Sequence, residues 1–170
     1  NTQPTDDTWS GTGQAAKLAT KFVGIGSLGK LAAGNMYTGN YLRTEGTNGV
    51  LNFGKQFTQR PTRLKGYFKY TSVEINKSND EMKYLIGQPD TCQIFIALGD
   101  WSEPVEIRTK PSDRKLFDKN DPHIIAYADM YSGKSVTEYT PFTLELEYRD
   151  TDRIPTYIVV VASASNCLLY

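Results

Sequence analysis

The sequence has no excess charge of either sign and no long apolar run. Its 19 Lys and Arg residues balance 19 Asp and Glu residues, so bulk electrostatics gives the chain no attraction to nucleic acid. The longest apolar run, residues 157–162, is far shorter than the roughly 20 residues that cross a bilayer. We therefore expect neither a nucleic-acid partner nor a membrane-spanning segment.

Cysteine and histidine are also scarce. Two cysteines do not make a disulfide framework, and Cys92 lies in an apolar pattern where a free thiol packs as a small hydrophobe. The sequence leaves open whether Cys92 pairs with Cys167. His123 is the single histidine, and without a second His or Cys at ligand spacing it is better explained as a structural residue than as a zinc ligand or a catalytic base.

Aromatic and turn-forming residues are plentiful: 11 Tyr, seven Phe, 14 Gly and eight Pro, which is typical of an all-β domain. No segment favours a helix long enough to cover a parallel sheet, so two antiparallel sheets must cover each other. We expect one all-β domain over residues 1–170, a two-sheet antiparallel jelly-roll β-sandwich. Apolar patterns predict its strands at residues 15–23, 35–43, 50–57, 60–70, 91–98, 104–109, 123–131, 141–148 and 157–164.

Residues 60–70 form the clearest of these strands. Leu64, Gly66 and Phe68 fall on one face, and cationic and aromatic side chains fall on the other, since strand side chains alternate with period two. We expect this strand in the middle of a sheet. Elsewhere, the polar residues 1–14 predict an extended arm or linker remnant, Asn48-Gly49 predicts a hairpin turn, and residues 71–89 predict a long surface loop.

Five stretches, in order, cover most of the chain: KLAAGNMYTG at 30–39, LNFGKQF at 51–57, RPTRLKGYFKY at 60–70, QIFIALGDW at 93–101 and YIVVVASAS at 157–165. They resemble the putative carbohydrate metabolism domain family, whose members are secreted or surface proteins of gut anaerobes. The resemblance implies a jelly roll similar to carbohydrate-binding modules (galactose-binding-domain-like), an extracytoplasmic location at the cell surface, in the periplasm or as a secreted protein, and a polysaccharide or oligosaccharide partner. It also implies an additional N-terminal domain in the full-length protein.

The end of the chain departs from the family pattern. In the family, a Gly-rich loop and a last strand follow the stretch that corresponds to residues 162–165, whereas here residues 166–170 follow at once. We therefore expect the C-terminal strand to be truncated. Nothing that the family does with that loop or strand is carried over to this chain.

The candidate sugar-binding residues combine flat aromatic faces with charged groups, because rings stack on sugars and charges bind hydroxyls. They are Trp101, Tyr67, Lys69, Glu103 and Arg149. Trp101, in a loop after a strand end, is the strongest of them. The alternative is that the strand residues merely pair across a solvated sheet face.

A structural calcium ion is a second candidate ligand, and we expect no other cofactor. Asp118, Asn120 and Asp121 form an oxygen-rich loop, and calcium prefers carboxylate and carbonyl oxygens. Charged surface loops have the same composition without binding a metal, so the loop alone does not decide between the two.

Three functions remain open, and the first is favoured. The first is a non-catalytic carbohydrate-binding or carbohydrate-handling module. The second is a glycoside hydrolase that uses surface carboxylates such as Glu103 and Glu106, but residues three apart in a strand point to opposite faces, so we assign no catalytic residue. The third is a structural or adhesive surface module without a small ligand.

Overall fold

The computed structural model describes residues 1–25, 28–78 and 82–166. In these ranges the chain is all-β, and every strand pairing is antiparallel. The only helical segments described are two short 3-10 turns, η1 (Lys83–Leu85) and η2 (Pro111–Asp113). No helix of the described ranges has the length and apolar character needed to span a membrane. The prediction of an antiparallel all-β fold is confirmed, and its jelly-roll detail stays a prediction.

The strands follow the chain in this order: β1 (Thr2–Thr5), β2 (Ala15–Leu18), β3 (Lys21–Ile25), β4 (Leu28–Ala32), β5 (Asn35–Tyr37), β6 (Gly39–Glu45), β7 (Asn48–Phe53), β8 (Lys55–Gln56), β9 (Arg63–Tyr70), β10 (Cys92–Gly99), β11 (Val105–Arg108), β12 (Ile124–Ser132), β13 (Val136–Glu145), β14 (Glu147–Tyr148) and β15 (Tyr157–Ser163).

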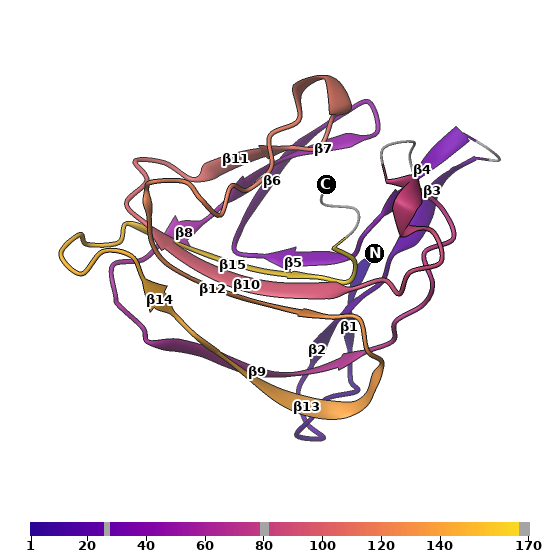
Figure 1. The fold of residues 1–170 in the computed structure, drawn as a ribbon, viewed down its shortest axis with the longest axis horizontal. Coiled ribbons are helices and arrows are strands. Elements are labelled where there is room, and N and C mark those ends of the chain that lie inside the picture. The colour runs from indigo at the N-terminus through magenta and orange to yellow at the C-terminus, as the bar shows by residue number, and fades with distance from the viewer. Residues whose placement is uncertain (26–27, 79–81, 167–170) are drawn as a thin grey trace.

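The strands form layers above and below one central sheet (Figure 1). The central sheet has the order β14-β12-β10-β15-β5, with β8 also paired to β15. The sheet β11-β7-β6 covers one face and the ribbon β13-β9 covers the other, and a separate apolar cluster fills each interface. By hydrogen bonding, the described strands thus divide into more sheets than the two expected from sequence, because the hairpins β1-β2 and β3-β4 also pair only within themselves.

Strand β10 is apolar along most of its length because it is covered on both faces. Phe95 and Ala97 pack in the cluster under β11-β7-β6, whereas Ile96 and Leu98 pack in the cluster above β13-β9. All four side chains are buried, and each large one stabilises the fold by roughly 1.5–3 kcal/mol relative to exposure. The continuous apolar pattern therefore marks a strand between two layers.

Strand β9 shows the predicted alternation but not the predicted place. Its exposed and half-buried residues alternate without a break, yet among the described strands it pairs only with β13. The expectation that it lies in the middle of a sheet is wrong. The chain leaves this ribbon at Leu146, after which β14 pairs with β12 of the central sheet, so the ribbon covers the central sheet instead of extending it.

Residues 1–14 are not a free arm. Strands β1 and β2 form a hairpin in which Thr2 lies opposite Leu18, and its tip contacts the β13-β9 ribbon. Trp9 stacks on Tyr67 with the ring centroids 4.1 Å apart and an interplanar angle of 9°. Lys69 forms an ion pair of 3.0 Å with Asp7. A segment that looked like a linker remnant is therefore part of the packed domain.

The hairpin predicted around Asn48-Gly49 exists, but its turn lies two residues earlier. Glu45 pairs with Asn48, so Gly46 and Thr47 form the turn, and Gly46 has the φ of +64° that favours glycine. Gly49 lies in β7, where its N–H donates to Thr109 Oγ1 over 3.0 Å. The predicted loop at 71–89 has no strand in the part that the structure describes.

Two sequence predictions concern the chain end. Cys92 is buried and forms no disulfide within the described residues, and burial raises the pKa of its thiol. Cys167 and the truncated last strand lie outside the described residues, so the pairing of the two cysteines and the end of the sheet stay predictions.

Candidate functional site

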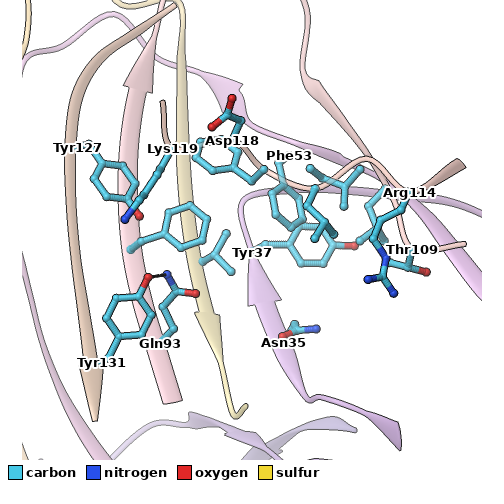
Figure 2. Close-up of a pocket in the computed structure, with 16 residues that line it drawn as sticks. Asn35, Tyr37, Phe53, Gln93, Thr109, Arg114, Asp118, Lys119, Tyr127 and Tyr131 are labelled. Carbon is cyan, nitrogen blue, oxygen red and sulfur yellow. Dashed lines mark hydrogen bonds between the residues drawn. The ribbon is translucent and has the colours of Figure 1, made fainter. Parts of the chain in front are cut away.

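A pocket of about 300 Å³ opens between the central sheet and the β11-β7-β6 sheet, and we call it the interlayer pocket (Figure 2). Strands of both sheets and the loop between β11 and β12 line it. The lining residues are Asn35, Tyr37, Leu51, Phe53, Gln93, Phe95, Ile107, Thr109, Arg114, Leu116, Phe117, Asp118, Lys119, Tyr127, Tyr131 and Val161.

Aromatic rings form much of the wall. Phe117 stacks on Phe95 with centroids 5.1 Å apart, and Tyr127 approaches the same phenylalanine at 6.0 Å. On the other side, Tyr37 and Phe53 lie 4.8 Å apart. Four of the lining residues, Phe53, Phe95, Ile107 and Val161, also belong to the buried core cluster, so the core of the domain holds the wall in place.

The loop of residues 109–123 brings charged groups to the pocket. Its start is fixed by two backbone hydrogen bonds between Arg108 and Lys115, of 2.8 and 3.0 Å. Phe117 then packs inward against the core, while Arg114 and Lys119 on either side of it in sequence stay exposed. One half-buried ring therefore anchors a loop whose neighbouring positions carry charge.

Two amides supply polar groups inside the pocket wall. Gln93 is only 7% exposed, and its Nε2 donates to the Tyr131 hydroxyl over 2.7 Å (Figure 2). Asn35 Oδ1 is buried and has no hydrogen-bond partner among the described residues. A buried acceptor without a donor is unfavourable unless a ligand or water supplies one. The wall thus holds an acceptor that suits a hydroxyl group.

Tyr37 adds a neutral hydroxyl to the lining. Desolvation by burial, and secondarily the neighbouring Tyr41, raises the pKa of Tyr37 above its usual value of 10.0. The phenol therefore keeps its proton over the whole physiological range and is available as a hydrogen-bond donor.

Trp101 does not face solvent, which overturns its interpretation as a surface stacking residue. It is 7% exposed and belongs to the same core cluster as Phe95. Its ring lies in a T-shaped arrangement 6.1 Å from Phe117, and its Nε1 donates to Asp121 Oδ2 over 3.0 Å. Trp101 supports the pocket from behind and offers no ring face to a sugar.

The other four predicted sugar-binding residues are not brought together. Tyr67 and Lys69 lie on β9, in the layer beyond the central sheet, where the N-terminal hairpin contacts both. Glu103 lies exposed in the turn before β11, outside the lining. Arg149 also lies outside the lining, but its guanidinium is 5.6 Å from the ring centroid of Tyr127, so it contacts the pocket wall indirectly.

The predicted calcium ligands make turn hydrogen bonds. Asp118 Oδ1 accepts from the Asn120 N–H over 2.8 Å. Asp121 Oδ1 accepts from the His123 N–H, and its Oδ2 accepts from Trp101. In the described residues no group of three or more His, Cys, Asp or Glu side chains is arranged to hold a metal ion. Calcium binding here stays a prediction, and nothing below depends on it.

Asp118, predicted as a calcium ligand and not as part of a saccharide site, lines the pocket, and the other lining residues were not predicted. One signal was present: Gln93 is an amide inside the otherwise apolar strand β10, and a buried amide must find a partner. The remaining lining residues come from strands far apart in the sequence, so no spacing pattern connects them.

The carboxylates near the pocket bear on whether it could cleave a glycosidic bond. Glycosidases of the common type need two carboxyl groups flanking the scissile bond. Among the described lining residues, Asp118 is the one carboxylate. Glu106, proposed from sequence as a partner for Glu103, instead forms an ion pair of 2.9 Å with Arg108, and this contact lowers its pKa.

Solved structures show what the fold is similar to. A structure described as a putative glycoside hydrolase from Bacteroides thetaiotaomicron VPI-5482 has a TM-score of 0.56 and 20% identity, over 86% of this chain and 50% of that chain. Another, described as a putative glycoside hydrolase from Bacteroides vulgatus ATCC 8482, has a TM-score of 0.50 and 16% identity, over 89% of this chain and 70% of that one. This chain thus spans half the length of the first.

At these identities the similarity concerns the fold. Among curated proteins, none matches this chain. The sequence model of the family described as putative carbohydrate metabolism domain matches residues 2–167, nearly the whole length, and the chain therefore belongs to that family.

Proposed function

We propose that this domain binds a saccharide in the interlayer pocket and does not cleave it. The observation that carries the proposal is the composition of the lining, which joins aromatic walls to buried amides and a neutral phenol and contains Asp118 as its one described carboxylate. Aromatic faces suit the apolar side of a sugar ring, and fixed polar groups suit its hydroxyls.

The size of the pocket supports a small ligand or one end of a longer chain. Its volume of about 300 Å³ is at the lower limit of the roughly 300–1,000 Å³ common for small-molecule sites. Membership of a carbohydrate-related family favours a saccharide over other small polar ligands. On the resemblance to that family we further propose an extracytoplasmic location, within a longer protein.

Hydrolysis is the second candidate, because both similar structures are described as putative glycoside hydrolases. It requires a second carboxyl group near Asp118. A structural or adhesive role without a small ligand is the third. The same experiment separates all three.

The test is a glycan array followed by isothermal titration calorimetry with the best saccharide. Gln93→Leu keeps the side-chain volume but removes both polar atoms, so affinity should fall about tenfold or more. Tyr67→Leu, on the opposite layer, is the matched control and should leave affinity unchanged. Circular dichroism melts of both variants confirm that the folds are intact.

Three results would overturn the proposal. Saccharide affinity that survives Gln93→Leu and disappears in Tyr67→Leu would move the site to β9. New reducing ends released from the bound saccharide would establish hydrolysis. Silence across the array, together with self-association in solution, would favour the adhesive role.

A further inference from the structure

Two cations at the interlayer pocket have no ionic partner. Arg114 and Lys119 both line the pocket and are exposed, and neither forms an ion pair or a side-chain hydrogen bond within the described part of the chain. Two other arginines do form ion pairs: Arg108 contacts two carboxylates at 2.9 Å, and Arg153 also contacts two. Arg149, which stacks near Tyr127, forms no ion pair within the described residues. Two cations without an ion pair therefore lie where the ligand would sit.

The loop holds these cations on two sides of the pocket. Figure 2 shows Lys119 beside Tyr127 and Arg114 on the opposite side, near Thr109. Between them in sequence, Phe117 is fixed by its contacts with Phe95 and Trp101. The half-buried ring of Phe117 therefore holds the stretch of loop from which both cations extend.

The local charge balance is positive. Asp118 is the one described carboxylate of the lining, and its Oδ1 already accepts a backbone N–H in its own turn. Inside the wall, Asn35 Oδ1 and the amide of Gln93 can accept hydroxyl hydrogens. The pocket thus offers buried acceptors for hydroxyls and exposed cations for a negative group.

We propose that the ligand of the interlayer pocket is an anionic saccharide, whose hydroxyls bind the buried amides and whose carboxylate or sulfate binds Arg114 and Lys119. The inference rests on the proposed function above. Guanidinium groups bind carboxylates and sulfate-like oxyanions through paired, charge-assisted hydrogen bonds. A neutral sugar of the same shape would leave both cations in water and gain nothing from them.

The test compares pairs of sugars in which one member carries an added acidic group. Calorimetry measures methyl glucoside against methyl glucuronide, methyl galactoside against methyl galacturonide, and N-acetylglucosamine against its 6-sulfate. The acidic member should bind about tenfold more tightly, as expected for one charge-assisted contact, and this preference should shrink as salt rises. The uronide and sulfate arms show which anion the site takes.

Two double variants show whether Arg114 and Lys119 cause the preference for the acidic sugar. In Arg114→Gln with Lys119→Gln, the acidic and neutral sugars should bind alike, while affinity for the neutral sugar stays near that of the parent protein. The matched control, Arg63→Gln with Lys65→Gln on the exposed face of β9, removes the same charge and should keep the preference.

Each failure has a distinct meaning. Equal binding of acidic and neutral sugars by the parent protein, or a preference that the double variant retains, refutes the anionic ligand while leaving saccharide binding in place. Binding of none of these sugars, with silence across the glycan array, refutes the proposed function and this inference together.

Discussion

Trp101 offers the sharpest test of the structure, because burial and surface recognition predict different results for the same substitutions. In the fold the ring fills the core under the β11-β7-β6 sheet and lies so close to Gly99 that a Cβ there would come within 2.5 Å of it. Trp101→Ala removes a large buried ring, and such truncations cost about 3–5 kcal/mol of the free energy of unfolding. A stacking residue at the surface would cost almost nothing.

A second substitution separates the ring from its hydrogen bond. Trp101→Phe keeps an aromatic ring but deletes the donor to Asp121 Oδ2, which accepts from Nε1 over 3.0 Å. A half-buried acceptor that loses its donor costs about 1–3 kcal/mol. We therefore expect the free energy of unfolding to fall less in Trp101→Phe than in Trp101→Ala.

Urea unfolding followed by far-UV circular dichroism measures both values. Trp9→Ala is the matched control, because Trp9 is 60% exposed and should cost about 1 kcal/mol or less. Saccharide affinity is measured beside stability, since Phe117 contacts Trp101 and carries the pocket loop. A Trp101→Ala protein with parental stability and no saccharide binding would refute the burial argument and restore Trp101 as a surface stacking residue.

Two further predictions concern the hairpin and acid stability. Trp9→Ala should speed amide hydrogen exchange across the β1-β2 hairpin, because its tip loses the stack on Tyr67; unchanged exchange would mean that this contact does not hold the hairpin down. The Arg153 and Asp152 N–H groups, with the Arg153 guanidinium, lower the pKa of Asp150 to about 2. This stabilisation is complete above the unfolded pKa of about 3.9 and is lost as pH falls towards 2. In Asp150→Asn the melting temperature should therefore depend less on pH between pH 4 and 2 than in the parent protein. Equal pH dependence of the melting temperature in both proteins would contradict this expectation.

Several strand positions could be predicted from the sequence because period-two alternation reports which face of a strand is covered. The predicted strands at 15–23 and 35–43, by contrast, are each divided between two sheets. Residues 63–70 and 141–148 alternate between covered and exposed side chains as expected. The apolar run in β10 correctly indicated a strand covered on both faces. These patterns can be read from the sequence because each residue's polarity reflects whether its own side chain is buried.

The assignment of strands to layers could not be predicted in the same way. A half-covered strand shows the same alternation in the middle of a sheet and in a two-stranded ribbon, so β9 gave no sign that β13 is its partner in a ribbon. The β1-β2 hairpin has no apolar alternation, and its docking depends on Trp9 and Asp7 meeting residues some sixty positions away. The prediction that Trp101 lies at the surface failed for a related reason. A position just after a strand end usually lies at the surface, unless the chain turns back under the sheet.

The pocket divides its residues into those that hold the fold and those that meet the ligand, and this division limits how recognition can change. Phe53, Phe95 and Val161 serve both the pocket wall and the core cluster, so enlarging the pocket at these positions removes packing and lowers stability. Arg114 and Lys119 are exposed and contribute little to packing, so their replacement leaves the fold intact. Since Phe117 fixes the loop between them, we expect ligand preference to be changed most easily at these two rim positions, with the wall residues constrained by the core they share.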